Sequence, residues 1–399
     1  MSAPYAGNPY SFPAAVNTLS GSDAPSSTSI NTAPEGALDR TAWLYATGAG
    51  IIAQTWKSEF AATAIRSSCG LGALSWDPLR RVWVSTVADS SGNVITYTSL
   101  GVDDGNLWTA VGGSPAVAFG SNALIIANSA DPTTADQYWW IAANGTTVKV
   151  YNYTGSWSAS RSLTAAQAVT GAGMLAFAGV LIYGLAENTS SNSPLSSWNG
   201  TSWSDFSAGW GLGANAIYLK SNGSMVVAMS SANAFSGAPY YTSTDGIHWT
   251  SRTSPITTSE QISGLTWNGT AWYAAIYNTS TSYVRFVTSL DGISWSTISP
   301  APLTSGLHVT SLASVGALLV ASLAEGSNDQ SATASKAIFS LDNAQTWRPT
   351  QATLFQNAAS GSTSVYAMPE VIASDVQFAL FNTDYCRMSA IGGSGAPAL

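Results

Sequence analysis

Charged side chains are scarce in this sequence. Only 9% of its 399 residues are Asp, Glu, Lys or Arg, whereas an average soluble domain has about 25%. The 13 basic side chains are scattered and are outnumbered by 21 acidic ones, which gives a formal net charge of −8. Binding to a phosphate backbone needs a basic patch, so the composition excludes nucleic acid as a partner. Hydrophobic residues reach 45%, which is ample material for a core.

Cysteine, histidine and long apolar segments are also scarce. Cys69 and Cys386 make neither a disulfide framework nor a CxxC metal site, and His248 and His308 stand 60 positions apart without cysteine neighbours. We therefore predict no metal and no cofactor. The longest apolar run, residues 315–324, is much shorter than the ~20 residues of a membrane span, so we expect no membrane insertion. The first twenty residues lack the basic and apolar regions of a signal peptide.

Tryptophan, by contrast, is abundant and regularly spaced. Seven of the 16 tryptophans recur at intervals of 46 to 52 residues, with no helical pattern between them. This period is typical of one four-stranded blade of a β-propeller. The repeating tryptophans are Trp56, Trp108, Trp157, Trp203, Trp249, Trp295 and Trp347.

The residues before these tryptophans form a recurring turn. Residues 243–249, 289–295 and 340–347 share a Ser-x-Asp sequence and end in Trp, and residues 104–108 and 199–203 are thinner copies. Asp-Gly and Asn-Gly favour tight hairpin turns, because both central residues adopt positive φ. The Ser hydroxyl and the Asp carboxylate can bond the N–H groups that such a turn exposes. The Trp then offers a large apolar face for burial between neighbouring sheets.

These segments resemble the Asp-box, the bacterial neuraminidase repeat of sialidase-like β-propellers. In that family the box joins the third and fourth strands of a blade and lies away from the ligand face. The resemblance therefore implies a structural role, not a binding role, for the matching residues. They are Asp104, Trp108, Asp245, Trp249, Asp291, Trp295, Asp342 and Trp347.

The two ends of the repeat predict how the ring closes. After Trp347 there is room for three more strands, but no further Trp follows. Residues 51–56 could supply the missing fourth strand, since they end in the same Ala-Gln-Thr-Trp as residues 344–347. We therefore expect an all-β, seven-bladed β-propeller over residues 45–399. Pairing of residues 51–56 with residues 385–390 would close it and leave no open edge.

Residues 1–44 precede the propeller and differ from it in kind. They are rich in Pro, Ser, Ala and Asn and show almost no periodic apolar pattern, so they cannot form a core of their own. The alternatives are a disordered leader and an extended arm that docks on another subunit. The embedded apolar side chains of Tyr5, Tyr10 and Phe12 favour the extended anchoring arm.

The end of the arm carries a second resemblance. Asp39-Arg40-Thr41, which leads into an apolar stretch, resembles the segment that precedes the body of bacteriophage tail-fibre-like virion proteins. The Lys-poor composition, rich in Ser, Thr, Gly and Asn, is also similar to that of virion appendages. The resemblance implies a virion component on the exterior of the particle. Residues 1–40 would then contact other virion structural subunits.

No catalytic set emerges from the sequence. A sialidase needs three arginines, a Tyr–Glu pair and an Asp acid, and its family carries an Arg-Ile-Pro motif that this chain lacks. Arg66 would be the first candidate for such an arginine, with a solvated or stacked Arg as the alternative. Other glycosidases need two carboxylates about 5 to 9.5 Å apart, and nothing pairs the acids outside the turns, such as Asp131 and Glu260. No nucleophile elbow or phosphate loop occurs. We predict no catalytic residues.

A binding face is better supported. In a propeller the loops between second and third strands share one face with the crossings between blades. Here we expect those loops to be long and polar, at residues 128–136, 187–194, 230–240, 278–283 and 325–336. Aromatic rings beside amides and hydroxyls suit sugar rings, and packing between blades is the alternative for each ring. The candidate ligand-binding residues are Trp210, Asn233, Phe235, Tyr240, Asn278, Tyr283, Asn328 and Asp329.

Together these features predict a non-enzymatic bacteriophage virion protein of the tail or an appendage. Its arm would anchor it to the particle, and its propeller would be displayed to bind a glycan or receptor on the host surface. Two alternatives remain: a passive decoration of capsid or tail, and a glycoside hydrolase that acts on a surface polysaccharide. Retention of a polysaccharide without cleavage would separate the first function from both alternatives.

Overall fold

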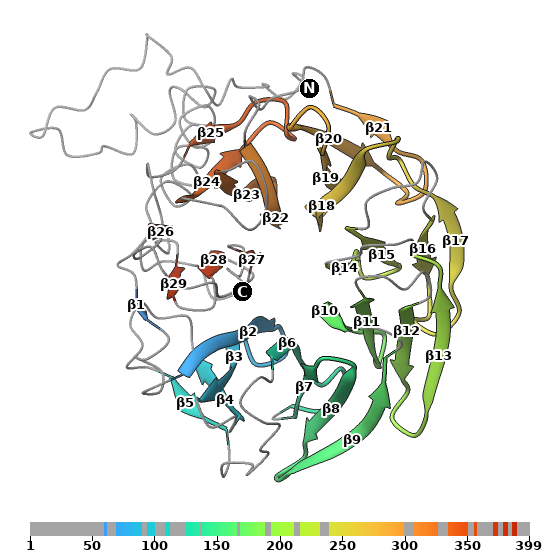
Figure 1. The fold of residues 1–399 in the computed structure, drawn as a ribbon, viewed down its shortest axis with the longest axis vertical. Coiled ribbons are helices and arrows are strands. Elements are labelled where there is room, and N and C mark those ends of the chain that lie inside the picture. The colour runs from blue at the N-terminus through green and yellow to red at the C-terminus, as the bar shows by residue number, and fades with distance from the viewer. Residues whose placement is uncertain are drawn as a thin grey trace, which may run out of the picture.

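The computed structural model is a ring of antiparallel sheets (Figure 1). Residues 1–59, and with them the predicted arm and the segment 51–56, lie outside the residues that it describes. The described residues are 60–61, 69–89, 94–99, 108–111, 124–135, 137–165, 168–187, 193–210, 216–231, 239–298, 307–325, 334–349, 355–356, 370–373, 378–381 and 385–388.

Six blades are each built from four consecutive strands. The first blade contains β2 (Cys69–Asp77), β3 (Val82–Asp89), β4 (Val94–Ser99) and β5 (Thr109–Ala110). The second contains β6 (Leu124–Ala130), β7 (Tyr138–Asn144), β8 (Thr147–Tyr153) and β9 (Trp157–Thr164). The third contains β10 (Val169–Phe177), β11 (Val180–Glu187), β12 (Ser193–Trp198) and β13 (Trp203–Ala208). The next three contain β14 (Ile217–Ser221), β15 (Val226–Ser230), β16 (Pro239–Ser243) and β17 (Thr250–Thr253); β18 (Glu260–Trp267), β19 (Trp272–Asn278), β20 (Tyr283–Ser289) and β21 (Ser296–Thr297); and β22 (Leu307–Val315), β23 (Leu318–Glu325), β24 (Ala334–Ser340) and β25 (Arg348–Pro349), with β26 (Phe355–Gln356) also paired to β24.

The remaining sheet is smaller, and the predicted blade count needs correction. Its order is β27 (Glu370–Ala373), β28 (Phe378–Phe381), β29 (Tyr385–Met388) and β1 (Phe60–Ala61). The structure therefore has six blades, and the prediction of a seven-bladed propeller is wrong. Among the described residues, the strand that pairs with β29 is β1, with two register pairs; the predicted partner, residues 51–56, lies outside the described residues. The physical reason is that the fourth strand here comes from a distant part of the chain, so no Ser-x-Asp turn and Trp tie it to the third.

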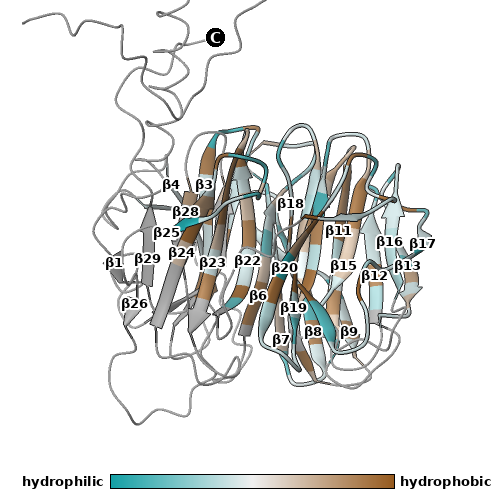
Figure 2. Ribbon diagram, turned by 90° about the horizontal axis from the view of Figure 1, so that it is seen from above, coloured by the Kyte–Doolittle hydropathy of each residue, from teal (hydrophilic) through white to brown (hydrophobic). Residues whose placement is uncertain are grey.

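The position of each strand follows from its residues. Second strands are buried on both faces and read as nearly continuous apolar runs, such as Trp-Tyr-Ala-Ala-Ile-Tyr in β19. Inner strands such as β14 are buried only in part. Outer strands such as β5 and β21 are short, polar and exposed. Figure 1 accordingly shows the first strand of each blade near the centre of the ring and the fourth at the rim. Figure 2 shows the apolar residues concentrated along the strands and polar residues at strand ends.

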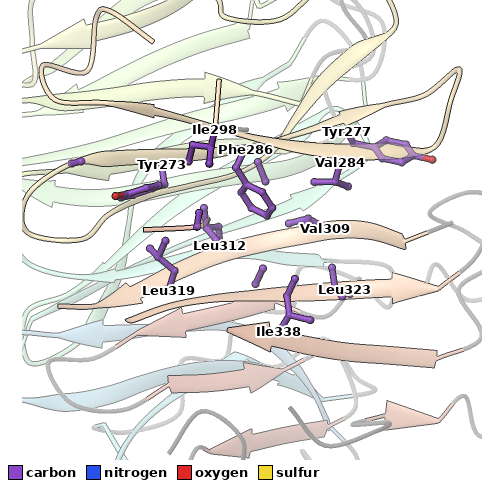
Figure 3. Packing of buried hydrophobic residues seen from close by; sticks show 14 residues of the cluster. Tyr273, Tyr277, Val284, Phe286, Ile298, Val309, Leu312, Leu319, Leu323 and Ile338 are labelled. Atoms are coloured by element: carbon purple, nitrogen blue, oxygen red, sulfur yellow. The ribbon is translucent and has the colours of Figure 1, made fainter. Parts of the chain in front are cut away.

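The core is divided into clusters that lie between neighbouring blades. One cluster joins β19 and β20 to β22 and β23, with Phe286, Val309 and Leu319 completely buried (Figure 3). Full burial of such a side chain contributes roughly 1.5–3 kcal/mol. Because every blade covers part of its neighbour, the positions of the loops on one blade depend on the packing of the next.

The strand order defines two faces of the ring. We call the face with the first-to-second and third-to-fourth connections the turn face, and the opposite one, with second-to-third connections and crossings between blades, the loop face. Residues 188–192, 231–238, 279–282 and 326–333 join second to third strands, as predicted. Residues 131–137 instead join β6 to β7, first to second, so the loop predicted at residues 128–136 belongs to the turn face. The second-to-third connection of that blade is a tight turn at Gly145, whose φ is 59°.

Candidate functional site

The Ser-x-Asp turns lie on the turn face, and their carboxylates are committed to the turns. Asp291 Oδ1 accepts hydrogen bonds from Ser289 Oγ (2.8 Å) and from the N–H groups of Ile293 (2.8 Å) and Ser294 (2.7 Å). These bonds hold the pKa of Asp291 well below its usual value. Asp245 and Asp342 make equivalent bonds in their own turns. Each of the described repeat tryptophans stands at or just before an outer strand.

These turns also contact the preceding blade. The Tyr240 hydroxyl, from β16, donates to the carbonyl of Gly292 or Ile293 (3.0 Å each) and accepts from Trp295 Nε1 at 3.1 Å. Gly292 packs so closely that a Cβ there would lie 2.5 Å from Met225 Cε. The turn is therefore a link between two blades.

Two of the predicted ligand-binding aromatics are buried between neighbouring blades. Tyr240 is 1% exposed, and Trp210 is completely buried with its ring edge-on to Tyr241 at 5.0 Å between centroids. Neither offers a ring face to solvent, so we leave both out of the candidate site. For these two residues the alternative of packing between blades holds.

The remaining sequence candidates divide into two groups. Asn233, Phe235, Asn328, Asp329 and the turn residue Asp104 lie outside the described residues. Asn278 and Tyr283 are described, and the structure brings them together. They flank the connection between β19 and β20 on the loop face and are directly opposite each other in the register of the two strands.

A row of side chains extends from this pair across the sheet. Glu260, the first residue of β18, is opposite Asn278, which is opposite Tyr283. Residues directly opposite in an antiparallel sheet project from the same face, as do residues two apart on one strand. Arg285 therefore shares this face with Tyr283. The row combines an exposed aromatic ring, an amide and an ion pair at one end of a single blade.

The turn between Asn278 and Tyr283 is rigidly built. Asn278 Oδ1 accepts from the N–H groups of Ser280 and Thr281, both at 3.0 Å. The N–H and the hydroxyl of Thr279 both donate to the carbonyl of Ser259, at 2.7 and 3.0 Å. Ser259 belongs to the crossing from β17 to β18, so two loop-face segments are fixed to each other. We call residues 257–259 and 278–283 the Tyr283 platform.

The exposed side chains of the Tyr283 platform are polar apart from the ring of Tyr283. The Tyr283 side chain is 51% exposed. Thr279, Ser280 and Thr281 are exposed beside it, as is Thr257 in the crossing. An exposed ring surrounded by hydroxyls offers one apolar face for stacking and several short hydrogen-bonding groups.

An ion pair lies beneath the Tyr283 platform. Arg285 Nε and Nη2 donate to the two oxygens of Glu260, both at 2.8 Å, and Nη2 also donates to the Pro255 carbonyl at 2.8 Å. The Glu260 side chain is 7% exposed and that of Arg285 is 22% exposed. Burial alone would raise the pKa of Glu260, but the hydrogen bonds from Arg285 and Thr257 outweigh it and lower the pKa. Glu260 is therefore an anion at neutral pH.

An aromatic stack supports the platform from the side of the next blade. Tyr277 stacks on His308 of β22, with ring centroids 4.2 Å apart and planes at 23°. Figure 3 shows Tyr277 at one end of the interblade cluster, beside Val284, with Tyr273 at the other end. The platform therefore rests on the apolar core.

The sequence reasoning missed how Glu260 and Arg285 are used. Glu260 is an acid outside the turns, but nothing in the spacing of 25 positions pairs it with Arg285. The signal is in the register: two hairpins place the first residue of β18 opposite the last of β19 and the first of β20. Counting residues outward from the turn of each hairpin would have predicted that Glu260 and Tyr283 lie in the same row across the sheet.

Both Glu260 oxygens accept from Arg285, and one also accepts from the Thr257 N–H. In the described part of the chain no three His, Cys, Asp or Glu side chains are grouped as a metal site would require. No helix in the same ranges has the length and hydropathy of a membrane span.

Comparison with known proteins shows the fold but no family. No protein-family model matches the chain, and no curated protein matches it in sequence. Among solved structures, YCF48 from Cyanidioschyzon merolae superposes with a TM-score of 0.50 at 12% identity, over 83% of this chain and 98% of that one. The Dos1 propeller (TM-score 0.47, 10% identity, 87% and 98% covered) and an oligogalacturonate lyase in complex with manganese (0.49, 12%, 81% and 90%) are also similar. The likeness to YCF48 supports a β-propeller, and an identity this low assigns no function.

Proposed function

We propose that the chain is a non-enzymatic binding protein whose Tyr283 platform holds a glycan of a cell surface. The observation that carries the proposal is the exposed ring of Tyr283 beside three exposed hydroxyl side chains on a turn fixed by hydrogen bonds. A sugar ring presents C–H groups that stack on an aromatic face, and its hydroxyls can pair with Ser and Thr hydroxyls. Because the turn is already ordered, binding costs little conformational entropy.

The state of Glu260 supports a role in binding rather than hydrolysis. A glycosidase needs one carboxyl group that is protonated at the working pH and a second carboxylate 5 to 9.5 Å away. Glu260 has a lowered pKa, and both of its oxygens accept from Arg285. It can neither supply a proton to a leaving group nor approach a substrate as a free nucleophile.

We extend the proposal to a bacteriophage virion on the grounds of sequence alone. The Asp39-Arg40-Thr41 segment, the Lys-poor composition and the arm of residues 1–40 support it. In this proposal the arm binds other virion subunits and the propeller is displayed on the exterior of the particle. The hydrogen bonds of the three described Ser-x-Asp turns support their interpretation as Asp-box turns with a structural role.

A retention assay with a matched control tests glycan binding. The full chain is passed over immobilised host-envelope polysaccharides, and the release of reducing ends is followed in parallel. We expect retention without cleavage, and Tyr283→Ala should weaken it roughly three- to tenfold, because an aromatic contact contributes about 0.5–1.5 kcal/mol. Leu290→Ala is the control, since Leu290 is 80% exposed but lies in a turn of the opposite face. Equal weakening in both variants, or release of reducing ends, would refute the proposal.

The virion assignment is tested separately. Particles purified from the strain that encodes the chain should contain it by mass spectrometry. A chain that lacks residues 1–40 should be absent from the particles although it is expressed. Incorporation of the truncated chain would rule out anchoring by the arm.

A further inference from the structure

The ion pair beneath the Tyr283 platform determines which sugars the platform can accept. Resting on the proposed function, we infer that the platform binds neutral sugars and discriminates against acidic ones such as sialic or uronic acids. The inference starts from Arg285, the cation that lies under the platform. An acidic sugar is recognised best by an arginine that offers both parallel N–H groups to the carboxylate.

The donors of Arg285 are already engaged. A guanidinium has five N–H groups. Nε donates to Glu260 Oε1, and the two Nη2 hydrogens can serve Glu260 Oε2 and the Pro255 carbonyl. Nη1 donates to Thr297 Oγ1 at 3.1 Å. Four of the five N–H groups therefore have partners inside the protein, and the edge that would grip a ligand carboxylate faces Glu260.

The charge of the pair points the same way. Arg285 Nη2 and Glu260 Oε2 are 2.8 Å apart, so the two charges neutralise each other. Among the described residues of the platform, a ligand carboxylate that leaves water would find neither a free cation nor a bidentate donor, so its desolvation would go uncompensated. The net charge of −8 adds long-range repulsion of polyanions. A neutral sugar needs only hydroxyl partners and a stacking surface, which Thr279, Thr281 and Tyr283 provide.

The experiment removes the charge of Glu260 and leaves its shape. Glu260→Gln leaves the Arg285 guanidinium uncompensated under the platform, and Arg285 is still 22% exposed. The full chain and the variant are compared on immobilised mannan and dextran, which are neutral, and on polysialic acid and alginate, which are acidic. We expect the natural chain to be retained by a neutral polymer only. The variant should gain about tenfold or more on an acidic polymer at low salt, since a hydrogen bond to a charged group contributes about 1.5–3 kcal/mol.

The double variant Glu260→Gln/Arg285→Gln is the matched control. It removes both charges, so the gain on acidic polymers should disappear while the shape of the site changes little. Circular dichroism and thermal unfolding establish that both variants are folded. If Glu260→Gln does not fold, the comparison of neutral and acidic polymers with the natural chain still decides the inference.

The outcomes separate this inference from the proposed function. Retention of an acidic polymer by the natural chain, lost in Tyr283→Ala, would leave the function standing and overturn the neutral preference. A folded Glu260→Gln variant that gains nothing on acidic polymers would also overturn it. No retention of any polymer by the natural chain would remove the proposed function, and the inference would fall with it.

Discussion

The hydroxyl of Tyr240 should stabilise the ring although it touches no ligand. Tyr240 is 1% exposed, and its hydroxyl joins β16 to the Gly292 turn of the next blade by one donated and one accepted hydrogen bond. Tyr240→Phe keeps the ring but leaves the Trp295 N–H and a turn carbonyl without this partner. Leaving partly buried groups unpaired costs about 1–3 kcal/mol, so the free energy of unfolding should fall by that amount.

The assay is urea unfolding followed by tryptophan fluorescence, with Tyr283→Phe as the control. That substitution removes the same atom from a tyrosine that is 51% exposed, so it should change the free energy of unfolding by less than about 0.5 kcal/mol. Under conditions where Tyr240→Phe is folded, the variant should be retained on polysaccharide as strongly as the natural chain. Equal midpoints for the two variants would refute the link between blades. Lost retention at unchanged stability would return Tyr240 to the binding site.

The Gly292 turn yields two further predictions. Gly292→Ala should lower the free energy of unfolding by about 1–3 kcal/mol, because its φ of +68° disfavours a side chain and the new Cβ would meet Met225 at 2.5 Å. Gly223 has a φ of +87° but open space around it, so Gly223→Ala should lose only the stability that the strained backbone costs. A decrease in the free energy of unfolding as large as that of Gly292→Ala would contradict the reasoning. Asp291 has a lowered pKa in the folded state, so its contribution is present above the unfolded pKa of about 3.9 and is lost as pH falls below it. Urea unfolding at pH 6 and pH 3 should therefore show a smaller loss in Asp291→Asn than in the natural chain; equal losses would exclude this role.

Most of the fold could be predicted from the sequence because the repeat depends on residues that are close together in the chain. Each Ser-x-Asp turn supplies its own hydrogen bonds, and each described repeat Trp stands at or just before an outer strand. The four-stranded blade and the order of its strands therefore follow from the spacing. Closure is different in kind. The described partner of β29 comes from a distant part of the chain, and residues 51–56, with the identical Ala-Gln-Thr-Trp, lie outside the described residues. The two residues that pair with β29, Phe60 and Ala61, carry no such motif.

The candidate site was predictable in its loops but not in its side chains. The sequence identified the connection at residues 278–283 and its two flanking residues, Asn278 and Tyr283. It did not separate Tyr283 from Tyr240, since both are aromatic residues near the start of a third strand. Ligand-facing and core-facing tyrosines look alike until the alternation of the strand is taken into account.

Counting back from the serine of each Ser-x-Asp turn supplies that alternation. Tyr240 stands three residues before Ser243, and Tyr283 stands six before Ser289, so the two rings project from opposite faces of their blades. The residue three before Ser289 is Phe286, which is completely buried like Tyr240. At six before the serine, the other two turns have Gly237 and Ala334. Among the three blades with this turn, only the one with Tyr283 thus has an aromatic residue six positions before the serine. A glycan that binds through Tyr283 should therefore saturate these blades at one site per chain.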